Sequence, residues 1–158
     1  LEELRMTLDS LEPMDGDLAT ILGTLRSRVA PALQAAGIQL QWQVQEVPPL
    51  SGLDARGVMH LFRCVQEIFA NVVKHAHARR VTVRTWADAA RVYLAVEDDG
   101  IGLPPNDQRS EGRGLGNIAV RAEKIGAEVR FYATWPGTGV EFAFPIQGQP
   151  PAWSLTQR

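Results

Sequence analysis

A long amphipathic pattern between residues 54 and 76 constrains the fold of this chain more than any other feature. Apolar side chains recur there at helical spacing, which predicts a long helix that buries one broad stripe against a sheet. The stripe consists of Val58, Leu61, Phe62, Val65, Phe69, Val72 and Val73. Four polar residues, Arg63, Glu67, Asn71 and Lys74, fall on the opposite face at helical spacing. That face is either a functional surface or a solvated one held by an Arg63–Glu67 pair.

Strand-like segments surround this helix in a characteristic order. A helix is expected from an N-cap at Asp17 to about Ala36, where Gly37 stops it, and another from about Leu115 to Ile125, ended by Gly126. Strands are expected at residues 38–47, 80–87, 91–97, 127–134 and 138–146. Because the last four strands form two hairpin-like pairs, the pattern predicts an α+β fold. Its mixed, mostly antiparallel sheet is covered by helices on one face.

Composition narrows the class of protein only moderately. The chain has 158 residues and is 45% apolar, which suits one well-buried core. Its formal net charge of −2 gives no general attraction to nucleic acid or anionic membranes, although it leaves room for a local basic patch. Cys64 is the only cysteine, so no internal disulfide forms. No run approaches the roughly 18 apolar residues of a membrane span.

Asn71 gives the polar face of the long helix a chemical interpretation. Asparagine is a poor helix former, yet it lies mid-helix with Glu67 one turn before it and Lys74 one turn after it. Magnesium accepts an amide oxygen together with phosphate oxygens and water. The trio therefore suits a metal-bound triphosphate, with Lys74 offsetting phosphate charge and Glu67 orienting a reacting group.

Two glycine-rich motifs follow the helix. In the first, Asp98 ends a strand and precedes Gly100 and Gly102, whose backbone can turn sharply and approach a flat ligand. A carboxylate there can accept a hydrogen bond from the exocyclic amine of adenine, although Asp-Gly pairs are also common in simple turns.

The second motif, residues 112–117, precedes an expected helix, where free backbone N–H groups suit phosphate. A flexible hinge is the alternative. Its spacing matches neither the dinucleotide fingerprint nor the P-loop.

Three segments in this order carry a family resemblance. Residues 67–76 resemble an asparagine box, Asp98–Gly102 a first glycine box and Gly112–Asn117 a second. The chain thus resembles the Bergerat-type ATP-binding domain of bacterial sensor histidine kinases. These belong to the wider family of gyrase, heat-shock chaperone, histidine kinase and MutL ATPases. The wording of the asparagine box looks most like the nitrate-sensor and desaturase-thermosensor subfamily (HisKA_3).

The resemblance implies a role for individual residues. Glu67 and Asn71 would be catalytic, with Asn71 the magnesium ligand, although a carboxylate beside the phosphorylated histidine can replace Glu67 as the base. Asp98 would recognise adenine. The implied ATP-binding set is Asn71, Lys74, His75, Asp98, Gly100, Gly102, Gly112, Arg113, Gly114, Leu115 and Gly116.

The resemblance also implies an organisation. Residues 1–14 would be the end of a dimerisation helix and a linker, residues 15–146 the ATP-binding domain, and residues 147–158 a disordered tail. The domain would be cytoplasmic, in a parent that can be membrane-anchored. It would act with ATP and Mg²⁺, an upstream dimerisation and phosphoacceptor domain, and a response regulator. The parent would be a homodimer and this chain a monomer, with no nucleic-acid partner.

The family phosphorylates a histidine on a separate domain. His60, His75 and His77 are the only histidines here, and none has a typical acceptor context, so this chain should bind ATP without phosphorylating itself. A metal site formed by His75 and His77 lacks an evident third ligand. Two other functions remain open: an anti-sigma-type serine kinase with the same fold, and a nucleotide-sensing or structural module that transfers no phosphoryl group.

Overall fold

The computed structural model describes residues 17–50, 52–75, 77–102 and 113–146. Its centre is a five-stranded sheet in the order β1-β2-β3-β5-β4. The strands are β1 (Gln39–Gln43), β2 (Arg80–Ala87), β3 (Arg91–Asp98), β4 (Glu128–Ala133) and β5 (Thr138–Pro145). β1 pairs with β2 in parallel, and the other three pairings are antiparallel. The predicted mixed, mostly antiparallel sheet is confirmed.

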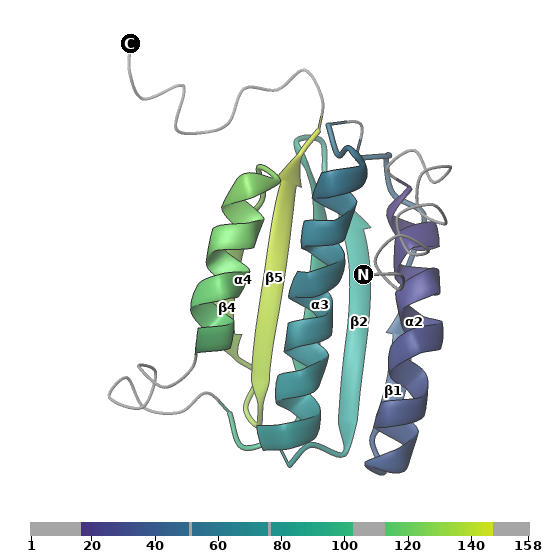
Figure 1. The fold of residues 1–158 in the computed structure, drawn as a ribbon, viewed down its shortest axis with the longest axis vertical. Helices are drawn as coiled ribbons and strands as arrows, with labels where there is room; N and C mark the ends of the chain where they lie inside the picture. Colours follow the sequence, from purple (N-terminus) through teal and green to yellow (C-terminus); the bar gives the residue numbers. More distant parts are fainter. Residues whose placement is uncertain (1–16, 51, 76, 103–112, 147–158) are drawn as a thin grey trace.

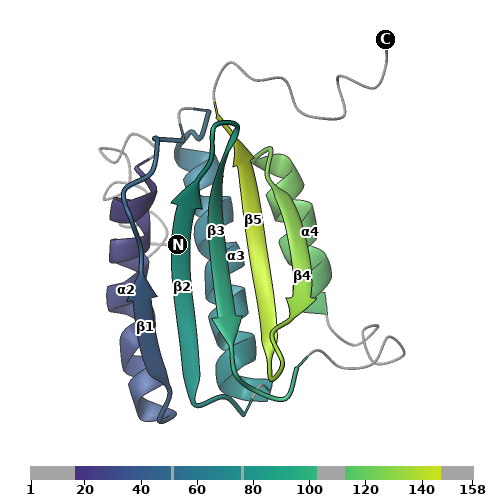
Figure 2. The ribbon, with the colours of Figure 1, turned by 180° about the vertical axis from the view of Figure 1, so that it is seen from behind.

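Helices α2 (Leu18–Ala35), α3 (Ala55–His75) and α4 (Arg113–Lys124) lie together on one face of this sheet (Figure 1). Viewed from the other side, the sheet carries no helix within the described ranges (Figure 2). α3 lies along the strands over the middle of the sheet, and α4 runs antiparallel to α3 (Figure 1). This arrangement confirms the α+β class with helices on one face. None of these helices combines the length and apolar character needed to cross a bilayer.

The alternation of side chains along the strands explains the two layers. In β2, Val81, Val83 and Thr85 are buried, whereas the side chains between them are only half-buried. Because successive side chains in a strand point to opposite faces, the buried set faces the helices.

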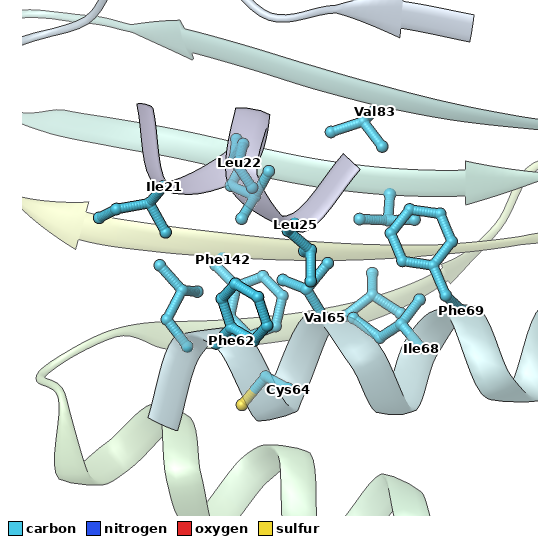
Figure 3. Close-up of a cluster of buried hydrophobic side chains, with 14 of the residues drawn as sticks. Ile21, Leu22, Leu25, Phe62, Cys64, Val65, Ile68, Phe69, Val83 and Phe142 are labelled. Atoms are coloured by element: carbon cyan, nitrogen blue, oxygen red, sulfur yellow. The ribbon is translucent and has the colours of Figure 1, made fainter. Parts of the chain in front are cut away.

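The core lies between this buried face of the sheet and helices α2 and α3 (Figure 3). Ile21, Leu22 and Leu25 of α2 meet the apolar stripe of α3, and Phe142 of β5 lies beneath them (Figure 3). Six of the seven predicted stripe residues are buried. The exception is Val73, which is 38% exposed because it lies at the edge of the stripe, near the end of the helix.

On the face of the sheet that carries no helices, polar and aromatic side chains of the strands contact one another. Arg84 forms an ion pair with Glu97, which also accepts a 2.6 Å hydrogen bond from the Tyr132 hydroxyl. Trp86 stacks on Tyr93 with ring centroids 5.1 Å apart. These contacts join strands β2, β3 and β4, so the open face is stabilised without a second layer of helices.

Several boundaries differ from the sequence-based expectation. The strand expected over residues 38–47 ends at Gln43, because the Thr85 hydroxyl takes over the backbone pairing at Gln45, with bonds of 2.8 and 2.9 Å. Asp17 does occupy the N-cap of α2, but its carboxylate accepts from the Thr20 hydroxyl instead of a backbone N–H. The helix expected from Leu115 begins two residues earlier, at Arg113. Residues 1–14 and 147–158 lie outside the described residues.

Candidate nucleotide-binding site

Four segments that are distant in the sequence meet at one end of the sheet. They are the last residues of β3, the C-terminal end of α3, the N-terminal end of α4, and the turn between β4 and β5 (Figures 1 and 2). The first glycine motif, Asn71 and the second glycine motif therefore lie at the same end of the molecule, as one ligand site would require.

Asp98 is the last residue of β3, and main-chain groups hold it in place. Its Oδ1 accepts a 2.8 Å hydrogen bond from the Gly100 N–H, and the Thr138 N–H also donates to its carboxylate. Burial raises the pKa of the Asp98 carboxyl above its ordinary value, against the effect of those two donors, and the charge of Asp99 adds to the rise. No ion pair reaches Asp98 among the described residues. Its carboxylate is thus a half-buried acceptor without a cation.

The neighbouring Asp99 has a different task. Its Oδ1 accepts hydrogen bonds from the Arg79 and Arg80 N–H groups at 2.8 and 2.9 Å. Partial burial opposes ionisation, but these backbone donors together lower the pKa of the Asp99 carboxyl. These hydrogen bonds join the end of β3 to the start of β2, so the Asp99 carboxylate has a structural role.

The turn between β4 and β5 packs directly against the end of β3. A Cβ atom added to Gly137 would lie 1.9 Å from the Asp98 carbonyl oxygen, so only glycine allows this approach. The Thr134 hydroxyl oxygen lies 2.9 Å from the Asp98 carbonyl oxygen and 2.7 Å from the Pro136 carbonyl oxygen, and the hydroxyl can donate to either. Gly102 has φ +85°, and an added Cβ would lie 3.5 Å from the Gly137 carbonyl oxygen. The first glycine motif and the hairpin turn therefore form one wall.

Contacts between α3 and α4 place Asn71. The Cys64 thiol donates to the Ile118 carbonyl oxygen at 3.8 Å, which fixes where the two antiparallel helices touch. Asn71 lies about two turns further along α3, and Gly114 lies about one turn back along α4. Since both steps lead to the same end of the molecule, the half-buried Asn71 lies on the flank of α3 that faces the start of α4.

The other polar residues of α3 follow the expected face. Glu67 is half-buried and Lys74 is exposed. The alternative ion pair between Arg63 and Glu67 is not formed; the ion pairs of the described residues all lie on the strands. His75 belongs to α3, but its side chain lies outside the described residues, as does Gly112.

Residues 113–117 of the second glycine motif lie within a helix, which corrects the expectation that the motif precedes one. α4 begins at Arg113, so Gly114 and Gly116 occupy its first turn, and an added Cβ at Gly116 would meet nothing within 4 Å. The N–H groups of a first helical turn have no partner within the helix and carry a partial positive charge. They therefore suit a phosphate, together with the backbone of the motif.

Thr134, Gly137 and Thr138 were missed by the sequence analysis. All three contact Asp98 through the turn between β4 and β5. The available signal was the glycine pair Gly137 and Gly139 around Thr138, since two glycines so close together are unusual at the start of a strand.

No group of three or more His, Cys, Asp or Glu side chains that could hold a metal occurs in the described ranges. A magnesium ion bound mainly by phosphate oxygens and water needs no such group, and the amide of Asn71 supplies an oxygen of the kind magnesium prefers. The residues present thus fit a nucleotide-borne metal better than a resident one.

A known protein family matches the part of the chain that forms this site. The family described as "Histidine kinase-, DNA gyrase B-, and HSP90-like ATPase" matches residues 57–148. The chain belongs to this ATPase family. The match begins in α3 and runs past the end of β5, so it includes every segment of the candidate site.

Two relatives of this chain are histidine kinases. The chain is 33% identical over 147 residues to the signal transduction histidine-protein kinase/phosphatase UhpB of Salmonella typhimurium, which covers 91% of this chain and 28% of UhpB. It is 31% identical to the sensor histidine kinase LiaS of Bacillus subtilis, covering 69% of this chain and 29% of LiaS. The chain thus spans less than a third of these two relatives.

A solved structure supports the fold. The blue-light activated histidine kinase of Erythrobacter litoralis EL346 aligns with a TM-score of 0.71 and 22% identity, covering 93% of this chain and 48% of that one. The described fold is therefore that of the ATP-binding domain of histidine kinases.

Proposed function

We propose that this chain is the catalytic domain of a two-component sensor histidine kinase. It binds Mg-ATP and donates the γ-phosphoryl group to a histidine on a separate dimerisation domain, from which a response regulator receives it. The observation that carries this proposal is that the end of β3, the C-terminal part of α3 and the start of α4 lie at one end of the sheet (Figure 1). A ligand with both a base and a phosphate chain would use all three.

The adenine end of the proposed site is built around Asp98. A carboxylate held by main-chain donors, without a neighbouring cation, is free to accept from the exocyclic amine of adenine. Gly100, Gly102 and Gly137 carry no side chain between this carboxylate and a flat ring. Thr138, whose N–H donates to Asp98, helps to hold the carboxylate in its orientation.

The phosphate end lies between α3 and α4. Asn71 would supply an oxygen to Mg²⁺, whose charge would neutralise the phosphates when bound. Lys74 and His75 would lie near the phosphates, and the motif that opens α4, from Gly112 to Gly116, would hold them through backbone N–H groups. Glu67 would orient the reacting group. Catalysis would rest on positioning and on charge neutralisation, as phosphoryl transfer generally does.

The acceptor histidine would come from outside this chain. His60 lies half-buried on α3, and His77 follows the end of that helix, so neither stands on a separate helical domain. The proposed boundaries are residues 1–14 for the end of a dimerisation helix, 15–146 for the ATP-binding domain and 147–158 for a tail. We place the domain on the cytoplasmic side of the parent kinase and assign it to the HisKA_3 subfamily.

Titration calorimetry tests the nucleotide site. ATP, ADP and GTP would be titrated with and without Mg²⁺, and ATP should bind more tightly than GTP because Asp98 would accept from the 6-amino group of adenine, where guanine has a carbonyl oxygen. Asp98→Asn should weaken ATP binding by about 10- to 100-fold, and Asn71→Asp should change its Mg²⁺ dependence. Asp88→Asn removes the same charge at the opposite end of β3 and should have no effect. Unchanged Mg-ATP affinity in both site variants would refute the site.

A second assay tests phosphoryl transfer. The chain would be mixed with a separately produced dimerisation domain and γ-labelled ATP, and label should appear on a histidine of that domain. Labelling of a serine on a partner protein would favour an anti-sigma-type kinase. Binding of ATP without any transfer would favour a nucleotide-sensing module.

A further inference from the structure

The side chain of Thr134 links the turn between β4 and β5 to the backbone of Asp98. Thr134 directly follows the last residue of β4 and opens this turn. Both views of the fold place the turn beside the end of β3 (Figures 1 and 2). The Thr134 hydroxyl lies within hydrogen-bonding distance of the Asp98 and Pro136 carbonyl oxygens, at 2.9 and 2.7 Å. A side chain of the turn therefore contacts the main chain of the residue proposed to recognise adenine.

This contact lies where the regular pairing of β3 with β5 stops. The register between the two strands ends at the pair of Glu97 and Gly139, so Asp98 lies one residue beyond it. A partly buried carbonyl group at the end of a ladder needs another hydrogen-bond donor. The Thr134 hydroxyl is a side-chain donor at the right distance from the Asp98 carbonyl oxygen. It thus continues the hydrogen bonding of the sheet by one residue.

The turn is packed too closely to absorb a change at Thr134. The Thr134 N–H donates to the Gly137 carbonyl oxygen at 3.2 Å, which closes the turn. A Cβ atom added to Gly137 would lie 2.7 Å from the Thr134 hydroxyl oxygen and 1.9 Å from the Asp98 carbonyl oxygen. The hydroxyl, the turn and the Asp98 carbonyl therefore form one packed unit, and losing the hydroxyl should move the Asp98 main chain.

The neighbouring contact of the same hairpin reaches a side chain instead. The Tyr132 hydroxyl donates to the Glu97 carboxylate at 2.6 Å, and a Cβ atom added to Gly139 would lie 2.2 Å from the Tyr132 ring. These contacts hold the hairpin against β3 one residue before Asp98. A link to a side chain leaves the main chain free to adjust, whereas the link from Thr134 acts on the Asp98 main chain directly.

We propose that Thr134 is a positioning residue that sets the preference of the site for adenine over guanine, an inference that rests on the proposed function. The Asp98 Oδ1 accepts from the Gly100 N–H at 2.8 Å, so the direction of the carboxylate follows from the local main chain. Adenine has a 6-amino donor where guanine has a carbonyl oxygen, so a well-placed carboxylate attracts adenine and repels guanine. Thr134 acts on this choice through Asp98, without touching the ligand.

Thr134→Val tests this role, because valine keeps the branched shape and removes the hydroxyl. In titration calorimetry, Mg-ATP affinity should fall by about 5- to 20-fold, while Mg-GTP affinity changes by less than about twofold. Thr134→Ser keeps a hydroxyl and should preserve the wild-type ratio of the two affinities. Thr134→Ala removes the same hydroxyl and should reproduce the valine result, which guards against a folding defect specific to valine.

Thr85→Val is the matched control. The fully buried Thr85 hydroxyl also joins two main-chain groups, since it accepts from the Gln45 N–H at 2.8 Å and donates to the Gln45 carbonyl oxygen at 2.9 Å. Thr85 pairs with Leu94, four residues before Asp98 on β3. Urea unfolding should show that Thr85→Val destabilises the fold at least as much as Thr134→Val, yet the ratio of ATP to GTP affinity should stay at the wild-type value.

A second measurement needs no nucleotide. In amide NMR spectra of the free chain, the Gly100 N–H that donates to Asp98 should shift in Thr134→Val but keep its position in Thr134→Ser and Thr85→Val. Equal losses of ATP and GTP affinity in Thr134→Val, or a changed affinity ratio in Thr85→Val, would overturn the role of Thr134. If the wild-type chain binds neither nucleotide, the proposed function fails and this inference with it. A wild-type preference for ATP that persists in Thr134→Val refutes this inference alone.

Discussion

Gly137→Ala provides the sharpest test of how the candidate site is built. Gly137 has φ +111°, and a Cβ atom there would lie 1.9 Å from the carbonyl oxygen and 2.7 Å from the carbonyl carbon of Asp98. Both atoms belong to the backbone of β3, which cannot move aside as a flexible side chain can. The substitution should therefore strain the hairpin turn and displace Asp98 at the same time.

The expected size of the effect has two parts. A side chain held at this φ costs about 1–3 kcal/mol, and an atom forced into a packed contact costs about another 1–3 kcal/mol. We expect the free energy of unfolding to fall by about 2–6 kcal/mol, a large part of the roughly 5–15 kcal/mol of a typical domain. ATP affinity should fall as well, because the Asp98 carboxylate moves with its carbonyl.

Two other glycines separate these contributions. Gly126 has φ +71° with nothing within 4 Å of an added Cβ, so Gly126→Ala should cost only the conformational strain, about 1–2 kcal/mol. Gly23 lies inside α2 with equally open surroundings, and Gly23→Ala should stabilise the protein by about 0.5–1 kcal/mol. Urea unfolding of the three variants would measure the series. If Gly137→Ala destabilised no more than Gly126→Ala, the contact between the hairpin turn and Asp98 would be absent.

Three other predictions concern groups outside the proposed ligand contacts. Tyr132→Phe removes the 2.6 Å hydrogen bond to Glu97 and should cost about 1 kcal/mol in urea unfolding, with a larger cost contradicting a modest role. Cys64, whose thiol pKa burial raises to about 11, should resist a disulfide reagent at pH 8 in the folded chain and react promptly in urea; prompt labelling without urea would show it is exposed. Asp99, whose carboxyl pKa is lowered, contributes stability that is present above about pH 4 and is lost as the pH falls further. Asp99→Ala should reduce this acid dependence, measured by thermal unfolding between pH 3 and 7.

Most of the fold could be predicted from the sequence, because the spacing of hydrophobic residues determines its helices and strands. The stripe on α3 and the alternation in β2 follow from burial against one partner layer, and the sequence displays both patterns directly. The ends of elements were less predictable because tertiary contacts decide them. β1 stops where the Thr85 hydroxyl replaces a backbone partner at Gln45, a contact between residues 40 positions apart. No local sequence pattern at Gln45 predicts that contact.

Part of the candidate site was equally accessible from the sequence. Glycine-rich turns and a mid-helix asparagine are visible as departures from ordinary helix and strand composition. The contribution of the last hairpin was not accessible, because Gly137 resembles any turn glycine until the structure brings it against the Asp98 carbonyl. The start of α4 was misplaced for a similar reason: glycines normally favour positions outside a helix, and here two of them lie in its first turn.

The pair Asp98 and Asp99 shows most clearly what the structure adds. In the sequence, the Asp-x-Gly-x-Gly spacing of residues 98–102 points to Asp98 and assigns no role to Asp99. In the fold, the backbone N–H groups of Arg79 and Arg80 occupy Asp99 and lower its carboxyl pKa, whereas burial raises the pKa of Asp98 and leaves it without a cation. Both carboxylates accept two backbone N–H groups, but the half-buried Asp98 gains more than the exposed Asp99 by accepting a further hydrogen bond from a ligand. Asp99 follows the end of β3 and its carboxylate is held at the start of β2, so we propose Asp98 as the residue available to a base.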